Sequence, residues 1–188
     1  GIGSTAQYSI AKVIAALDPM FVLHTGDVIY PDGQASGYDP FFFQPYQAVL
    51  RRAPIFPSLG NHDVHGTGGS GQPYLDAFYL PQDNLSAAER YYSFDWGNAH
   101  FAALDYNDGP SAAQLNWLQS DLSSTDKDWK FVFYHQGIFS SGPHGHEAGI
   151  IAKRSILAPI FAAHKIDVVF NGHDHDYERL LVNGMPYF

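Results

Sequence analysis

The stretch Phe131-Val132-Phe133-Tyr134-His135 places a histidine directly after four apolar residues. A short apolar run of this kind is typical of a strand buried within a sheet. The runs Phe21 to Leu23, Ile55 to Leu59 and Asp167 to Phe170 are predicted strands of the same type, and each is closely followed by a polar segment. Helical periodicity alternates with the early strands, which favours an α/β fold with mixed sheets.

The other predicted elements follow from local signals. Helices are predicted over Thr5 to Leu17, Pro45 to Arg52, Tyr74 to Tyr79, Ser111 to Leu122 and Ala148 to His164, the last kinked or divided by Pro159. Hairpins are predicted around Gly97-Asn98 and Asn183-Gly184. The Gly- and Pro-rich stretches 31–40, 64–72 and 140–145 are predicted loops.

The composition suits one globular domain over residues 1–188. Apolar residues make up 45% of the chain and aromatic residues 15%, and the formal net charge is −9. This acidic balance argues against a basic platform for nucleic acid or anionic membranes. Cysteine is absent, so any metal must be bound by His, Asp, Asn or Tyr. No apolar run approaches the roughly 20 residues that span a bilayer.

The segment Gly26-Asp27-Val28-Ile29-Tyr30 follows the first predicted strand. In open α/β sheets, ligand sites gather at the ends of strands. The two oxygens of Asp27 could bridge two cations, and Tyr30 could add a phenolate, a hard donor that suits ferric iron. The alternative is that Asp27 caps the next segment and Tyr30 packs on the core.

The segment Gly60-Asn61-His62-Asp63 follows the second predicted strand. Asn61 offers a neutral oxygen ligand, His62 would face a substrate, and Asp63 would orient His62. The alternative is an ordinary turn, because Gly-Asn is common turn chemistry.

The remaining candidates are histidines of the second half of the chain. His135 is a candidate metal ligand, although a histidine at the end of a strand can also be a core residue. If Gly172-His173-Asp174-His175 is extended, His173 and His175 share one side and can reach two adjacent metals. The alternative is a surface turn. His144 and His146 lie in a Gly- and Pro-rich loop and could protonate a leaving oxygen, or have no role.

Together these segments resemble the calcineurin-like metallophosphoesterases, and within them the purple acid phosphatase branch. The family blocks Gly-Asp-x-x-Tyr, Gly-Asn-His-Asp/Glu, a strand ending in His, and Gly-His-x-His occur here in order, and Tyr177-Glu178-Arg179 also matches that branch. Gly1-Ile2-Gly3-Ser4 is similar to the tail of the first block, whose Asp would lie two residues before Gly1. The resemblance implies a sandwich of two mixed β-sheets flanked by helices, without the family's first strand and its C-terminal strands.

The resemblance also implies roles for the residues. Asp27 would bridge two metals, Tyr30 and His175 would bind a ferric ion, and Asn61, His135 and His173 would bind Zn²⁺, Fe²⁺ or Mn²⁺. His62 and His144 would contact the phosphate or the leaving group. The implied activity is hydrolysis of small phosphate monoesters by a metal-bound hydroxide at a binuclear site, in a secreted or periplasmic protein. The alternatives are a phosphodiesterase using the same site and a metal-binding domain without turnover.

Overall fold

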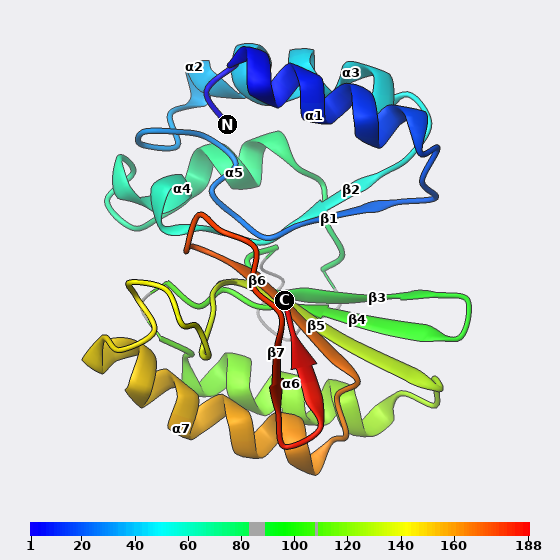
Figure 1. Cartoon of the computed structure of the whole chain (residues 1–188), viewed down its shortest axis with the longest axis vertical. Helices are drawn as coiled ribbons and strands as arrows, with labels where there is room; N and C mark the ends of the chain where they lie inside the picture. Colours follow the sequence, from blue (N-terminus) through cyan, green and yellow to red (C-terminus); the bar gives the residue numbers. More distant parts are fainter. Residues whose placement is uncertain (83–88, 108) are drawn as a thin grey trace. The chain divides into compact units, whose positions relative to one another are not determined.

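The computed structural model describes residues 1–82, 89–107 and 109–188. The chain forms two compact units, Gly1–Tyr79 and Leu80–Phe188. Each unit has its own sheet and its own helices (Figure 1).

The Gly1–Tyr79 unit is mostly helical around a small parallel sheet. Its elements are α1 (Thr5–Ala16), β1 (Val22–His24), α2 (Ala35–Tyr38), the π-helix η1 (Asp39–Phe43), α3 (Gln44–Leu50), β2 (Ile55–Pro57), α4 (Asn61–His65) and α5 (Gln72–Ala77). Strands β1 and β2 pair in parallel, with Leu23 opposite Phe56. Helix α1 begins after Ser4, whose hydroxyl accepts a hydrogen bond from the Gln7 amide at 3.2 Å.

The prediction of a loop over 31–40 is wrong for residues 35–40, which belong to α2 and η1. Gly37 suggests a break when the sequence is considered alone. In the structure, a Cβ on Gly37 would lie 2.6 Å from Cγ2 of Ile29. Glycine here allows the helix to pack closely on Ile29. Pro40 lies near the start of η1, where a missing N–H is tolerated.

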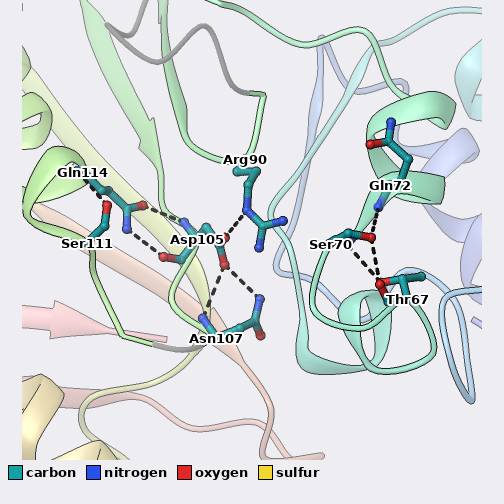
Figure 2. Close-up of polar contacts among 9 residues, drawn as sticks. Thr67, Ser70, Gln72, Arg90, Asp105, Asn107, Ser111 and Gln114 are labelled. Atoms are coloured by element: carbon teal, nitrogen blue, oxygen red, sulfur yellow. Dashed lines mark hydrogen bonds and ion pairs between the residues drawn. The ribbon is translucent and has the colours of Figure 1, made fainter.

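The loop after β2 is shorter than the predicted loop 64–72. Helix α4 begins at Asn61 and α5 at Gln72, so helices occupy both ends of the predicted loop 64–72. The loop between them is closed by side chains (Figure 2). Thr67 Oγ1 accepts from the Gly71 amide at 2.9 Å, and Ser70 Oγ accepts from the Gln72 amide at 3.3 Å. These bonds lead the chain directly into α5.

The Leu80–Phe188 unit contains a mixed sheet in the order β3-β4-β5-β6-β8-β7. The strands are β3 (Tyr92–Trp96), β4 (Ala99–Ala103), β5 (Trp129–Gln136), β6 (Val168–Gly172), β7 (Leu180–Val182) and β8 (Met185–Tyr187), with helices α6 (Ala112–Ser124) and α7 (Ala148–Ala163). Strands β4, β5, β6 and β8 are parallel, whereas β3 and β7 pair antiparallel to their neighbours. Helices α6 and α7 lie along the same face of the sheet (Figure 1), as right-handed crossovers require.

The two faces of this sheet carry different side chains. The helix-covered face carries the main core, in which Val132, Tyr134, Leu118, Leu157 and Phe161 are buried. The other face carries stacked phenylalanine rings from neighbouring strands. The stacked pairs are Phe94–Phe101, Phe101–Phe131, Phe131–Phe170 and Phe170–Phe188. Aromatic pairs across strands fix the register of a sheet.

Most of the predicted elements of this unit are confirmed. Both hairpins form where Gly97-Asn98 and Asn183-Gly184 predict them. Ser111 caps α6, accepting from the Gln114 amide at 3.1 Å. Pro159 does not divide α7, because Leu157 and Phe161 are both fully buried on either side of it and keep the helix on the sheet. The expected α/β class, with a mixed sheet and flanking helices, is confirmed. In the described ranges, no helix has both the length and the hydropathy to cross a membrane.

Candidate functional site

Asp27 occupies an unusual backbone position in the Gly1–Tyr79 unit. It has φ 54° and follows Gly26 at φ 90°, so both residues lie in the left-handed region. One carboxylate oxygen accepts the Tyr30 hydroxyl at 2.6 Å, and the other accepts the His62 amide at 3.0 Å. A Cβ on Gly60 would lie 2.2 Å from both the amide nitrogen and a carboxylate oxygen of Asp27. The position of this carboxylate is therefore set by the Tyr30 hydroxyl, by backbone groups and by the absence of a side chain at residue 60.

Asp63 accepts hydrogen bonds from backbone amides, which the sequence did not indicate. Its carboxylate is fully buried and accepts backbone N–H groups from Gly60 at 2.9 Å, Ile29 at 3.1 Å and Val28 at 3.2 Å. Burial raises the pKa of this carboxyl, while the three amides oppose the rise. The prediction that Asp63 orients His62 is wrong. Asp63 instead joins the turn after β1 to the start of α4.

His62 and Tyr30 lie against each other beside Asp27. Their ring centroids are 4.2 Å apart. Nδ1 of His62 lies 2.6 Å from the Pro31 carbonyl, which orients the imidazole. Burial, followed by the hydrogen bond to Asp27 and the Asp27 charge, raises the pKa of Tyr30 above its ordinary value. The phenol is therefore protonated in the metal-free chain, and the phenolate predicted from the sequence needs a bound cation.

In the Leu80–Phe188 unit, two of the predicted metal-binding histidines converge. Gln136 pairs with Gly172 in the register of β5 and β6, so His135 and His173 lie at neighbouring strand ends. Nε2 of His135 is 3.2 Å from Nδ1 of His173, and His135 is buried. Two imidazole nitrogens at this distance repel each other unless a proton or a cation lies between them. The pair is thus a candidate two-nitrogen metal ligand.

The segment 172–175 is not extended, so the condition under which His173 and His175 would share one side is not met. His173 has φ 77°, and the chain bends through residues 173–176 after β6 ends at Gly172. The alternation of an extended strand therefore does not apply to His173 and His175. His173 turns toward His135, whereas His175 is exposed.

The loop that carries His144 and His146 lies beside this histidine pair. The His144 ring centroid is 4.1 Å from that of His173, and its Nδ1 lies 2.7 Å from a carboxylate oxygen of Glu147. The hydrogen bond to Glu147 is the main cause that raises the pKa of His144, which favours the imidazolium form. His146 is exposed in the same turn. His144 is therefore the better placed of the two predicted proton donors.

The loop that follows the neighbouring strand β4 is also held by side chains. Asp105 follows β4 and accepts Arg90 Nε at 2.7 Å (Figure 2). Gln114 of α6 accepts from the Asp105 amide at 2.8 Å and donates to its carbonyl at 2.7 Å. The loop after β4 is thereby attached to the first turns of α6.

The predicted ligand set is divided between the two units. Asp27, Tyr30 and His62 form one contact group, and His135, His173 and His144 form another. Asn61 is the first residue of α4 and half-buried. Among the residues described, no group of three or more His, Asp or Glu side chains has the geometry to hold a metal by itself. Each unit presents part of the predicted donor set, and the complete set stays a prediction.

Sequence reasoning overlooked the polar side chains that support the His144 loop. Ser140, Glu147 and Arg154 contact this loop, and Asp174 accepts from it. Asp174 lies between two predicted ligands, which was the one signal in the sequence. Ser140 lies in the predicted Gly- and Pro-rich loop 140–145, whereas Glu147 directly precedes α7 and Arg154 lies within it, where a polar side chain gives no signal of its own.

Comparisons with known proteins identify the family of the chain. The family model for calcineurin-like phosphoesterases matches residues 5–177. Purple acid phosphatase 4 of Arabidopsis thaliana is 24% identical, over 97% of this chain and 60% of its own length. The Arabidopsis protein named probable inactive purple acid phosphatase 1 is 28% identical, over 84% of this chain and 29% of its own length. The chain therefore spans less than two thirds of either relative.

Solved structures show the same fold. A purple acid phosphatase from yellow lupin seeds superposes with a TM-score of 0.77 at 23% identity, covering 92% of this chain and 34% of the lupin chain. GAP50 of Plasmodium superposes with a TM-score of 0.73 at 19% identity, covering 98% of this chain and 66% of its own. With its family model matched over most of its length, the chain belongs to the calcineurin-like phosphoesterase family and has the metallophosphoesterase fold of its purple acid phosphatase relatives.

Proposed function

We propose that this chain hydrolyses phosphate esters, preferentially small monoesters, at a site that binds two metal ions. The observation that carries the proposal is the approach of His135 Nε2 to within 3.2 Å of His173 Nδ1. Two nitrogen acceptors that face each other at this distance are suited to share a cation. Membership of the calcineurin-like phosphoesterase family supports the same conclusion.

The donor types fit a mixed-metal site. His135, His173 and Asn61 would hold a divalent ion such as Zn²⁺, Fe²⁺ or Mn²⁺. Tyr30 and His175 would hold Fe³⁺, for which phenolate is a suitable hard ligand. Asp27 would bridge the two, because its two carboxylate oxygens already point to two different donors. When bound, the two ions would stabilise charge on the phosphoryl oxygens and activate a water for attack.

The two histidines outside this donor set, His62 and His144, would transfer protons to or from the substrate. The Pro31 carbonyl can only accept, so the bond at 2.6 Å places the proton of neutral His62 on Nδ1. Nε2 of His62 is then the atom that can gain or release a proton next to the substrate. His144 donates Nδ1–H to Glu147, and its Nε2 lies 3.9 Å from a carboxylate oxygen of Asp174. Two carboxylates therefore favour a protonated His144 that can protonate the leaving oxygen.

The test combines metal content with turnover. Asp27→Asn should lower the bound metal and reduce hydrolysis of p-nitrophenyl phosphate by at least about a hundredfold. Asp39→Asn removes a charge from an exposed side chain of the same unit and serves as the matched control. Unchanged metal content and turnover in Asp27→Asn would refute the proposal. The wild-type rate on bis(p-nitrophenyl) phosphate, compared with the monoester, separates monoesterase from diesterase activity.

A visible spectrum tests the metal assignment independently. A Tyr30 phenolate bound to ferric iron should give a purple charge-transfer band that Tyr30→Phe abolishes. A colourless protein that contains only zinc or manganese would refute the ferric assignment but not the hydrolase.

A second candidate function is metal binding without turnover. It is favoured by one observation, the 28% identity to an Arabidopsis protein named as probably lacking activity. Two bound metals with no hydrolysis of either a monoester or a diester would support this candidate over the enzyme.

A further inference from the structure

The loop over residues 138–145 is built around one carboxylate that the metal-ligand assignment does not use. Asp174 lies between His173 and His175, and its side chain is only 7% exposed. Ser140 Oγ donates to one oxygen of Asp174, and the His144 amide approaches the other oxygen at 3.4 Å. Asp174 therefore contacts the loop at two points four residues apart.

The loop is shaped to fit this carboxylate. Ser140 Oγ accepts the Gly142 amide at 2.8 Å while donating to Asp174. A Cβ on Gly142 would lie 2.6 Å from Cγ of Asp174. A Cβ on Gly145 would lie 2.0 Å from the Ser140 carbonyl oxygen. The glycines thus permit a tight turn that a residue with a side chain could not form here.

Helix α7 fixes the two ends of the same loop. Arg154 donates Nε–H to the Ile138 carbonyl at 2.6 Å and Nη2–H to the Gly145 carbonyl at 3.0 Å. A guanidinium that bonds both ends of a loop restricts how far the ends can separate. Between these ends, Asp174 contacts Ser140 and His144, and Glu178 contacts Ser141.

The position of the His144 ring depends on this arrangement. The ring lies over His173 with centroids 4.1 Å apart, and Glu147 accepts from Nδ1 at 2.7 Å. Asp174 belongs to the same turn as His173 and contacts the backbone of His144. One residue thus connects a predicted metal ligand to a predicted proton donor.

We propose that Asp174 is a positioning residue, which holds the Ser140–His144 turn so that His144 can protonate the leaving oxygen of the substrate. The proposal rests on the proposed function. In the step itself, the bond from phosphorus to the leaving oxygen breaks, that oxygen takes the electron pair, and the imidazolium of His144 transfers its proton to it. The water that attacks phosphorus supplies the oxygen of the new P–O bond. One of its protons stays on the phosphate product and the other is released to solvent, from which His144 regains the proton that it donated.

Substrates with different leaving groups test this role. A p-nitrophenolate leaves readily without a proton, whereas an alkoxide such as that of glycerol phosphate needs one. Ser140→Ala should lower kcat for glycerol phosphate by about tenfold and Asp174→Ala by about a hundredfold, with much smaller losses for p-nitrophenyl phosphate. Asp174→Asn keeps an oxygen acceptor for Ser140 and should restore part of the lost rate. An equal loss on both substrates would overturn the proposal.

Ser141→Ala is the matched control, because Ser141 lies in the same loop but bonds Glu178 instead of Asp174. Its amide keeps the bond to Glu178 at 2.8 Å, and the ratio of the two substrate rates should stay that of the wild type. A changed ratio in Ser141→Ala would show that any loosening of the loop has the same effect, and would overturn the specific role of Asp174.

Hydrogen exchange of the metal-free protein provides a measurement that does not depend on activity. The amides of Gly142 and His144 should exchange at least about tenfold faster in Ser140→Ala and Asp174→Ala than in the wild type. Unchanged exchange in both variants would overturn the proposal. If the wild type hydrolysed no ester, the proposed function would fail together with the catalytic part of this role, and exchange would still decide whether Asp174 holds the loop.

Discussion

The two groups of predicted site residues are held in place by different means. In the Gly1–Tyr79 unit, Asp27 is fixed mainly by a left-handed backbone, the His62 amide and the close approach of Gly60, with the Tyr30 hydroxyl as a further contact. In the Leu80–Phe188 unit, His144 is positioned by two carboxylates, because Glu147 accepts from its ring and Asp174 from its amide. A donor of the first kind moves only if the main chain moves, whereas one of the second kind can change rotamer. We therefore expect substitutions near Asp27 to affect stability and those near His144 to affect mainly loop geometry.

The largest effect is expected for Gly60→Ala. The new Cβ would lie 2.2 Å from two atoms of Asp27, so the turn after β1 and the start of α4 must separate. We expect a loss of about 3 kcal/mol in the free energy of unfolding, measured in urea. Gly149→Ala is the control, because a Cβ there meets nothing within 4 Å and alanine favours the helix. Equal losses in the two variants would show that the close approach of Gly60 to Asp27 does not determine the stability of this turn.

Arg154→Met tests the side-chain-held region. The substitution removes both hydrogen bonds to the loop carbonyls while keeping an apolar stem over Phe139, whose ring centroid lies 4.8 Å from the guanidinium carbon. We expect a loss of about 2 kcal/mol, smaller than that of Gly60→Ala, with faster exchange confined to residues 138–147. A loss that exceeds that of Gly60→Ala would reverse the comparison.

His100 gives the Leu80–Phe188 unit a pH dependence. It is buried, and its two nitrogens lie 2.8 Å from Asp95 and 2.8 Å from Asp121, with Lys127 bonded to Asp95 at 3.4 Å. Burial opposes the charge on the imidazole, but the hydrogen bonds and charges of Asp121 and Asp95 outweigh it and raise the pKa of His100 above 6.5. The folded state therefore binds the proton more tightly than the unfolded chain, which favours folding while His100 is protonated.

The sign of this effect can be measured with His100→Gln. The contribution is fully present below the pKa of the unfolded chain and is lost as pH rises through the raised pKa of the folded state. We expect the wild type to exceed His100→Gln by about 1.5 kcal/mol near pH 6, with the difference shrinking toward pH 9. A difference that grows with pH would contradict the assigned charge state.

The smallest effect is expected for Tyr30→Phe in the metal-free protein. The variant loses the hydroxyl that donates to Asp27 at 2.6 Å, but the His62 amide still donates to the other oxygen. We expect a loss of about 1 kcal/mol in thermal or urea unfolding. A loss as large as that of Gly60→Ala would show that the tyrosine, and not the backbone, fixes the carboxylate.

The parts of the fold that depend on local signals were predictable from the sequence. The hairpins at Gly97-Asn98 and Asn183-Gly184 need only their own turn residues, and α6 needs only its cap at Ser111. The helix over α2 and η1 was missed, because the reason for Gly37 is its packing on Ile29 and not a local break.

The candidate site shows the same limit. The residue types and their order were recognisable, but their partners lie far away along the chain. Asp63 bonds amides 34 and 35 residues away, and Ser140 and Asp174 are 34 residues apart. The left-handed conformation of His173 also has no sequence signal of its own, because most residues other than glycine, histidine included, adopt a negative φ.

The left-handed conformation of Asp27 has a consequence for how this position can evolve. Glycine would suit φ 54° better than any residue with a side chain, and the backbone strain is of the order of 1 kcal/mol. Exchange for glycine would relieve that strain and, in the same step, delete the carboxylate that Tyr30 and His62 contact. Backbone conformation and hydrogen bonding therefore favour opposite residues here. A descendant released from its chemical task would be free to accept glycine at this position, whereas one that still needs the carboxylate must retain the strain.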